Sequence, residues 1–283
     1  MWAIILHGGA KEIEPEEVDA HRQGCLTALA AGRQVLKAGG TAIDAVEAAV
    51  RELEADPTFN AGYGSALNAD GEVEMCSALM EGEHFNVGSV SVIQGVRHPI
   101  SVARAMLHED TILISGPGAR RFAAQKGLEI CDPADLIFQE ERERKTGTHD
   151  TVGCIALDVH GSIAVGTSTG GLDGSPPGRV GDSPQPGCGY YADNKIGAVA
   201  FSGDGEHIAR KMLAARVLNT LGKDGLDAAL KNSLNQVAAI GGEAGAIALT
   251  PDGRFGWQHN SRDFAVALQS SEQGQPQAFT RRQ

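Results

Sequence analysis

The sequence has few aromatic residues and no cysteine pattern that would join distant parts of the chain. Phe, Trp and Tyr make up 5% of the 283 residues. The five cysteines are an odd number, are scattered along the chain and never occur in a C-x-x-C spacing. We therefore expect neither a disulfide framework nor a zinc site.

Long hydrophobic runs and an excess of positive charge are also missing. No apolar stretch approaches the roughly 20 residues that a membrane helix needs. The start, MWAIILHGGA, has too short an apolar run and no basic lead for a signal peptide. The formal charge of −12 disfavours electrostatic binding to nucleic acid or to an anionic membrane. We expect a cytoplasmic protein that binds neither nucleic acid nor a membrane.

The rest of the composition is that of a folded globular protein with many turns. Hydrophobic residues make up 42% and charged residues 21%, and there are 37 glycines. Strand-like runs are predicted at 2–6, 73–79, 87–94, 111–115, 151–157, 162–167, 196–202, 244–250, 254–260 and 263–268. Helical spacing is predicted at 15–38, 41–56, 99–107, 118–126, 205–221 and 224–240. Residues 7–10, 170–189 and the tail after 270 are predicted to be irregular. Strands and helices that come in groups favour an α+β fold, with sheets packed together and helices outside.

One short motif suggests a serine hydrolase. Residues 166–170, GTSTG, match the G-x-S-x-G turn that carries a nucleophilic serine, here Ser168, and HGG at residues 7–9 resembles the matching oxyanion loop. His259 and Asp227 could complete a triad. That turn requires a helix after the serine, but the segment that follows, TGGLDGSPPGRVGDSPQPG, has too many Gly and Pro residues to form one. We therefore disfavour this interpretation.

The segment SGPGARR at residues 115–121 could cradle a phosphate at the start of a helix. It has neither the Lys-Ser/Thr of a P-loop nor the spacing of a dinucleotide fingerprint. We interpret it as an ordinary entry into a helix.

The segment GTHDTVG, residues 147–153, joins a charged run, QEERERK, to an apolar strand pattern. An ordinary loop that enters a strand would look the same. If the bond before Thr151 were cut, however, Thr151 would carry both a hydroxyl and a free α-amino group. An α-amino pKa of about 7.7–8.0 lets that group act as a general base near neutral pH. N-terminal threonines are a known form of the activated nucleophile.

A second pair of residues suits the head group of an amino acid. Arg179 offers a planar fork for a carboxylate, and Asp182, three residues later, is a natural acceptor for an ammonium group. An Arg-x-x-Asp pair taken alone is more often a surface salt bridge. Close to a reactive Thr151, the pair predicts a binding pocket.

These motifs together resemble a known family. HDTVGCIALD, GTSTGG, GRVGDSP, GYYADN and GAVAFSGDGE in the second half, with HGGA, FNAGYGS and EMCSALMEG in the first, are similar to the plant-type asparaginase and isoaspartyl aminopeptidase family. Its members are N-terminal nucleophile hydrolases related to glycosylasparaginase. The resemblance covers nearly the whole chain, and GTSTGG followed by GRVGDSP is highly specific.

The resemblance implies a four-layer αββα sandwich formed by one domain, residues 1–283. It implies a precursor that cuts itself between Asp150 and Thr151 into an α chain, 1–150, and a β chain, 151–283. The expected substrates are isoaspartyl dipeptides, L-asparagine or both. The expected assembly is a dimer of αβ heterodimers, and no cofactor is expected apart from a structural sodium ion.

By the same resemblance, Thr151 is the nucleophile and the hydroxyl of Thr169 helps to activate it. Arg179 would bind the α-carboxylate of the substrate and Asp182 its α-amino group. The oxyanion hole and the sodium loop follow from the same match. Ser202 and Gly203 stand where family members have a Thr-Gly pair at the oxyanion hole, and Asn60 matches an asparagine near the nucleophile. The sodium would be held by the main-chain carbonyls of Leu53, Glu54, Asp56, Phe59, Ala61 and Tyr63.

The sequence departs from the family at three places. Cys76 replaces a common aspartate, residues 172–175 (LDGS) replace a more polar segment near the leaving group, and GWQHNSRDFAVAL differs from the usual C-terminal pattern. The pair His149-Asp150 resembles the glycosylasparaginase junction. Two alternatives therefore stay open, a cytosolic glycosylasparaginase-like hydrolase and an uncleaved homologue that only binds amino acids.

Overall fold

The structure is a computed structural model that describes residues 1–138 and 150–281. The charged run before the predicted cleavage site and the residues between it and Asp150, including His149, lie outside the described residues. No helix in the described part of the chain is both long and apolar enough to cross a membrane.

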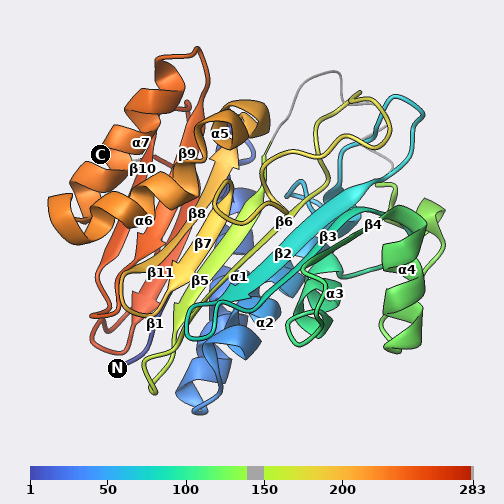
Figure 1. Cartoon of the computed structure of the whole chain (residues 1–283). Coiled ribbons are helices and arrows are strands. Elements are labelled where there is room, and N and C mark those ends of the chain that lie inside the picture. The colour runs from blue at the N-terminus through green and yellow to red at the C-terminus, as the bar shows by residue number, and fades with distance from the viewer. Residues whose placement is uncertain (139–149, 282–283) are drawn as a thin grey trace.

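Two sheets form the centre of the molecule (Figure 1). In the described residues the larger sheet has the strand order β12-β11-β1-β5-β6-β2-β3-β4, and the smaller has the order β10-β9-β8-β7. The strands of the larger sheet are β1 (Ala3–Gly9), β2 (Met75–Glu81), β3 (Val87–Ile93), β4 (Leu113–Ser115), β5 (Val152–Leu157), β6 (Ile163–Thr169), β11 (Ala265–Ser270) and β12 (Gln277–Phe279). Those of the smaller sheet are β7 (Tyr190–Asp193), β8 (Gly197–Gly203), β9 (Ala244–Leu249) and β10 (Phe255–His259).

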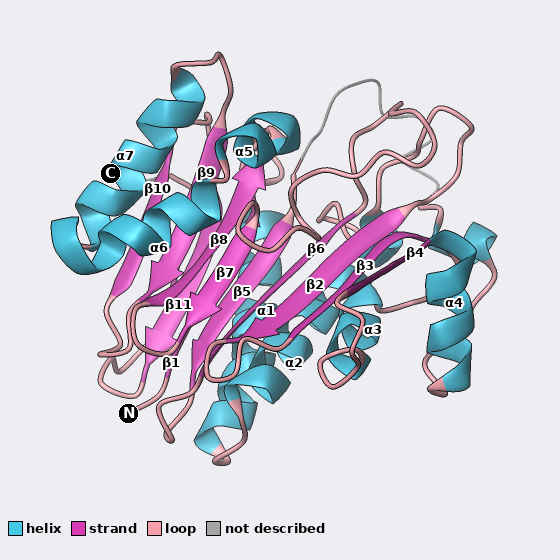
Figure 2. Ribbon diagram, in the orientation of Figure 1, coloured by secondary structure: helices cyan, strands magenta, loops and turns pink. Residues whose placement is uncertain are grey.

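Helices cover the outer faces of both sheets (Figure 2). On the larger sheet these are α1 (Val18–Lys37), α2 (Ala42–Ala55), α3 (Pro99–Ala105) and α4 (Gly116–Gln125), with the short turns η1 (Gly62–Gly64) and η2 (Pro133–Leu136). On the smaller sheet they are α6 (Leu213–Asp224) and α7 (Leu226–Ala238), preceded by α5 (Gly205–Lys211). The result is the four-layer αββα sandwich that the resemblance implies.

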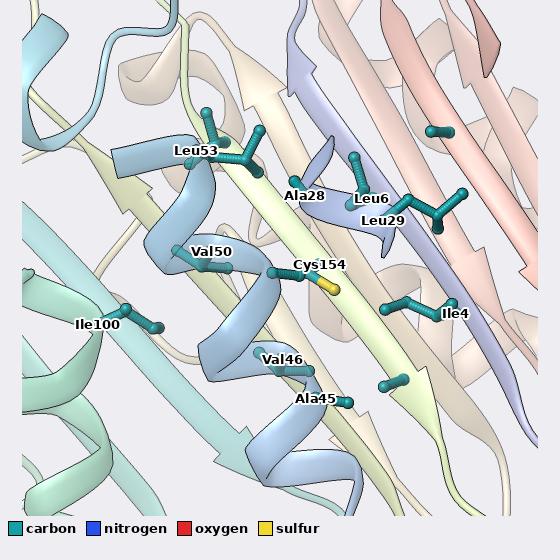
Figure 3. Close-up of a cluster of buried hydrophobic side chains, with 14 of the residues drawn as sticks. Ile4, Leu6, Ala28, Leu29, Ala45, Val46, Val50, Leu53, Ile100 and Cys154 are labelled. Carbon is teal, nitrogen blue, oxygen red and sulfur yellow. The ribbon is translucent and has the colours of Figure 1, made fainter. Parts of the chain in front are cut away.

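The strand pattern explains why a separate core forms on each face of the larger sheet. Successive side chains of a strand point to opposite faces, so Ile4 and Leu6 of β1 pack against the outer helices, as Figure 3 shows, whereas Ile5 faces the smaller sheet. In β5, Cys154 and Ile155 divide in the same way. Both faces of these strands are buried, which is why they read as continuous apolar runs.

Most predicted elements are confirmed, and the structure differs from the prediction at four places. Residues 7–9 continue strand β1 because β11 and β5 pair with it on both sides. The predicted helix 205–221 is broken at Met212, whose φ of 48° is left-handed. β7 was not predicted, because four residues are too few to show a period. The tail forms β12, which pairs with the edge strand β11.

The chain order of the larger sheet matters for the site. β5 and β6, from the second half of the sequence, lie between β1 and β2, from the first half. Because these strands are antiparallel, the end of β1, the start of β5, the end of β6 and the start of β2 lie together at the same end of the strands.

Candidate active site

Thr151 lies directly before β5 and is buried, with 5% of its surface exposed. Its backbone N–H donates to Ser202 Oγ at 3.0 Å, and its Oγ1 lies 2.8 Å from Ser183 Oγ. Ser202 is near the end of β8 in the smaller sheet. The hydroxyl and the nitrogen of Thr151 are therefore both held by side chains at the junction of the two sheets.

The carbonyl on the other side of the same peptide bond accepts two hydrogen bonds. Asn60 Nδ2 donates to Asp150 O at 3.1 Å, and Thr169 Oγ1 donates to it at 3.0 Å. The Asn60 amide is oriented because its Oδ1 accepts from the Ala66 N–H at 2.9 Å. Two side-chain donors aimed at one carbonyl oxygen form the geometry that stabilises a developing oxyanion.

The Asp150 side chain is fully buried and pairs with a lysine. Lys11 Nζ lies 3.1 Å from Asp150 Oδ2, and the exposed fractions of the two side chains are 9% and 0%. Gly9 lies against the same carboxylate: its φ is +118°, and a Cβ there would come within 2.5 Å of Asp150 Cβ and Oδ2. Glycine is needed at this position for both its backbone conformation and its lack of a side chain.

Ser202 Oγ accepts from two backbone groups, the N–H of Thr151 and the N–H of Ala10, each at 3.0 Å. A hydroxyl has two acceptor lone pairs and one donor hydrogen. Both lone pairs are occupied, so the hydrogen of Ser202 remains for donation. Gly203 follows with φ +128°, and a Cβ there would lie 2.4 Å from the Glu243 carbonyl oxygen.

Arg179 and Asp182 lie close together on the loop before β7. Arg179 Nε and Nη2 donate to the two oxygens of Glu206 at 2.8 and 2.7 Å, in a bidentate pair. Asp182 is 3% exposed, and its Oδ2 has no hydrogen-bond partner among the described atoms. Burial raises the pKa of Asp182 to about 7, although Arg179 opposes that shift. The surface salt bridge that was the alternative for Arg179 exists, but with Glu206 rather than with Asp182.

Ser183 joins this loop to the threonine. Its hydroxyl contacts Thr151 Oγ1, and its carbonyl accepts from Thr167 Oγ1 at 2.7 Å. The structure thus brings together Thr151, Thr169, Asn60, Asp150 and Ser202, with Asp182 next to Ser183 in the chain. Sequence reasoning missed Ser183 and Glu206, although they belong to GRVGDSP and GAVAFSGDGE, and it also missed Lys11, which no motif marked.

Cys76, one of the departures from the family, lies at the start of β2 opposite Thr169. It is buried, and burial raises the pKa of its thiol to about 11. The charge of Arg179 lowers this pKa and that of Asp182 raises it. At neutral pH the residue is an uncharged thiol.

The serine-hydrolase interpretation is wrong. Ser168 is fully buried and donates to Glu54 Oε1 at 2.7 Å. Because side chains alternate along β6, Thr169 faces the site whereas Ser168 faces the outer helices. His259 lies on β10 of the smaller sheet, and its Nδ1 is 2.9 Å from the Ser261 carbonyl oxygen. SGPGARR is the entry into α4, as predicted.

His7 is a buried polar residue that the candidate mechanism does not use. It lies on β1 opposite Gly153, and a Cβ on Gly153 would come within 2.4 Å of His7 Nε2. Burial lowers the pKa of His7 to about 3, so its ring is neutral.

The loop predicted to hold sodium is built from close backbone contacts. A Cβ on Gly62 would lie 2.1 Å from the Glu54 carbonyl oxygen, and one on Gly64 would lie 2.2 Å from that of Phe59. Glycines therefore let the loop close over these oxygens, which are ligands that suit a hard cation. Among the described residues, no group of acidic, His or Cys side chains is arranged to hold a metal ion.

The fold and this site together define a class of protein. A four-layer αββα sandwich with a threonine at the head of an inner strand is of the N-terminal nucleophile hydrolase type. Residues 1–146 and 138–278 match the family model described as asparaginase. The chain belongs to the asparaginase family.

Curated relatives are similar to this chain over most of its length. A bovine protein named isoaspartyl peptidase/L-asparaginase is 38% identical over 284 residues, which cover 93% of this chain and 92% of the relative. The human protein of that name is 37% identical over 285 residues with the same coverage. The Xenopus laevis protein is 39% identical over 259 residues, or 84% of both chains.

Proposed function

We propose that this protein is an amidohydrolase that cleaves the β-aspartyl amide of isoaspartyl dipeptides, of L-asparagine or of both. Its nucleophile would be Thr151, released by self-cleavage after Asp150. The observation that carries the proposal is the set of contacts on one peptide bond: the Asp150 carbonyl accepts from Asn60 and Thr169, and the Thr151 N–H donates to Ser202.

In the self-cleavage step, Thr151 Oγ1 attacks the carbonyl carbon of Asp150. The oxyanion that forms is stabilised by Asn60 Nδ2 and Thr169 Oγ1, which already donate to that oxygen. The carbon–nitrogen bond then breaks, the nitrogen takes the proton of the hydroxyl, and an ester joins Asp150 to Thr151 Oγ1. Water hydrolyses this ester. The α chain, 1–150, then ends in a carboxylate, and the β chain, 151–283, begins with a free amine.

In turnover, the free α-amino group of Thr151 takes the proton from Oγ1 as the oxygen attacks the β-carbonyl of the substrate. The Ser202 hydroxyl, whose lone pairs accept backbone N–H groups in the uncleaved chain, is poised to donate to the new oxyanion, together with the Gly203 N–H. The amine then leaves with a proton. Water releases aspartate from the β-aspartyl ester of Thr151.

The head group of the substrate would lie on Arg179 and Asp182. Glu206 holds Arg179 through Nε and Nη2, which leaves Nη1 and the second Nη2 hydrogen for the substrate α-carboxylate. The buried Asp182 Oδ2, which has no hydrogen-bond partner among the described atoms, suits the α-ammonium group. The glycosylasparaginase-like alternative uses the same head group with a larger leaving group.

The test is incubation of the purified protein followed by mass spectrometry and assays with L-asparagine and a β-aspartyl dipeptide. We expect two fragments, the smaller beginning Thr-Val-Gly-Cys, and hydrolysis of at least one substrate. Thr151→Ala should remain one chain without activity. A wild-type preparation that stays a single chain of 29.5 kDa and hydrolyses neither compound would favour the amino-acid-binding alternative.

We also propose that the loop of residues 53–63 holds a structural sodium ion through its carbonyls. The glycine-lined closure over the Glu54 and Phe59 oxygens supports this proposal. Replacing sodium by choline as the only added cation should lower the melting temperature, and equal melting temperatures would contradict it.

Finally, we propose a cytoplasmic dimer of αβ heterodimers. The five cysteines are all free, which fits a reducing compartment. The dimer rests on the family resemblance alone. Light scattering after size-exclusion chromatography should give twice the mass of the chain.

A further inference from the structure

We infer that the space held by the Asp150 side chain becomes a carboxylate-binding subsite after cleavage, with Lys11 as its cation, and that it takes the free carboxylate of a leaving amino acid. The inference rests on the proposed self-cleavage and deepens the proposed function, because it names the kind of substrate that the site prefers.

The first observation is the burial of the ion pair. Lys11 Nζ and Asp150 Oδ2 are 3.1 Å apart, and their side chains are almost completely buried. Among the described side chains, Asp150 provides the only carboxylate within ion-pair distance of Lys11. A buried charge whose partner is removed is strongly unfavourable. Once Asp150 becomes a chain end that can leave, the ammonium of Lys11 needs another anion.

The second observation is the shape of the space. Asp150 Cβ and Oδ2 lie against the backbone of Gly9, where no side chain intervenes. Departure of Asp150 would open a volume of carboxylate size, with Gly9 as its wall and Lys11 at its end. The neighbouring His21 does not compete as a cation, because burial lowers its pKa to about 4.

The third observation is the side of the nucleophile on which the space lies. In the sheet order β1-β5-β6-β2, Thr151 lies at the start of β5, with β1 on one side and β6 followed by β2 on the other. Lys11 follows the end of β1 on one side. On the other side, the loop that carries Arg179 and Asp182 is bound to β6 and to the residue before β2: Thr167 Oγ1 donates to the Ser183 carbonyl and the Gly178 N–H donates to Glu74 Oε2, each at 2.7 Å. A substrate whose head group lies over β6 and β2 therefore directs its leaving group toward β1.

The reach of a leaving amino acid also fits. Its nitrogen takes a proton from the Thr151 α-amino group, so the two nitrogens come within hydrogen-bond distance. From that nitrogen the leaving amino acid reaches its carboxylate through one α-carbon. In the uncleaved chain, more atoms separate the Thr151 nitrogen from Asp150 Oδ2. The hydrogen bond between the two nitrogens makes up this difference in length.

The test compares the purified, cleaved enzyme on two substrates, β-aspartyl-alanine and its C-terminal amide. We expect kcat/KM to be at least about tenfold higher for the free acid, the effect of one charge-assisted hydrogen bond. In Lys11→Met the acid-to-amide ratio should fall to near one, and in Lys11→Arg much of it should remain. Lys126→Met, which removes an exposed lysine of the Glu109 ion pair, is the matched control and should keep the wild-type ratio.

Two results would overturn the inference: equal kcat/KM for acid and amide in the wild type, or an unchanged ratio in Lys11→Met. Because Lys11 also neutralises Asp150 before cleavage, Lys11→Met could fail to cleave, and the wild-type comparison then decides alone. Failure of the proposed function looks different, since neither substrate nor L-asparagine would be hydrolysed.

Discussion

The side-chain hydroxyls of Thr151 and Ser183 lie 2.8 Å apart, and this contact ties the start of β5 to the loop that carries Asp182. The Ser183 carbonyl is held in turn by the hydroxyl of Thr167 on β6. The position of the proposed nucleophile relative to the proposed head-group pocket therefore depends on one small residue.

Ser183→Ala removes the partner of the Thr151 hydroxyl. We expect self-cleavage and kcat to fall by about tenfold, the value of one buried hydrogen bond. The appearance of fragments over time and steady-state kinetics measure the two effects. Ser183→Thr keeps the hydroxyl and should restore most of both rates, and a wild-type rate in Ser183→Ala would contradict the role.

Thr169→Ala removes one of two donors to the Asp150 carbonyl. Loss of such a donor typically slows a reaction by about 10²–10³, so fragments should appear correspondingly later on a denaturing gel. Thr169→Ser is the matched control because it keeps the donor. Cleavage of Thr169→Ala at the wild-type rate would mean that this hydroxyl does not stabilise the oxyanion.

Glu206→Gln weakens the bidentate hold on Arg179 without a change of shape. We expect KM for β-aspartyl substrates to rise several-fold with little change in kcat, because Arg179 would be less well oriented for the carboxylate. Glu243→Gln, an exposed neighbour, should leave both constants unchanged. A fall in KM would show instead that Glu206 competes with the substrate.

Asp182 predicts a pH dependence. Its pKa is raised to about 7 by burial, so the carboxyl is increasingly neutral below pH 7 and loses its attraction for an ammonium group. The inhibition constant of L-aspartate should therefore rise by up to about tenfold per pH unit below 7. Succinate has no ammonium group and should not show this rise. Parallel pH profiles for the two inhibitors would exclude Asp182 as the acceptor.

Leu29 on α1 belongs to the core between α1, α2 and the larger sheet (Figure 3). Leu29→Ala should lower the free energy of unfolding by about 2–5 kcal/mol. Urea denaturation in the Thr151→Ala background, which keeps the chain intact, measures the change. Ile112→Ala, at a side chain that is 54% exposed, should stay within about 0.5 kcal/mol of its parent.

Local patterns were enough to predict the long elements. Helical spacing predicts α1 and α2, and the start of the second predicted range at Thr41 agrees with the structure, in which the Thr41 hydroxyl caps α2 and accepts from the Asp44 N–H at 3.1 Å. β7 and β12 were missed because they are only four and three residues long, too short to show a period, although each pairs with a strand nearby in the sequence. Met212 carries no signal for a break, since only its surroundings impose its left-handed φ.

Motifs likewise indicated the candidate site only in part. They marked Thr151 and its neighbours, but they also marked Ser168. The Gly- and Pro-rich segment after that serine disfavours it, and the alternation of β6 turns its side chain away from that of Thr169. Lys11 could not be found from the sequence, and nothing in GAVAFSGDGE indicates that its Glu206 pairs with Arg179. The role of each residue depends on the side chain that it contacts. Lys11 and Asp150 are more than a hundred residues apart in the sequence, so only the packing of the fold brings them together.

The interleaved order of β1, β5, β6 and β2 has a consequence for the cleaved protein. Each fragment supplies strands that the other surrounds, so the cut would free a chain end without opening the sheet, and the fragments would part only when the core melts. Before the cut, unfolding concerns one chain and can reverse at any dilution. Afterwards the two pieces must find each other again, so recovery from heat would depend on protein concentration. Self-cleavage would thus replace one chain that refolds alone by two fragments that must associate in order to refold.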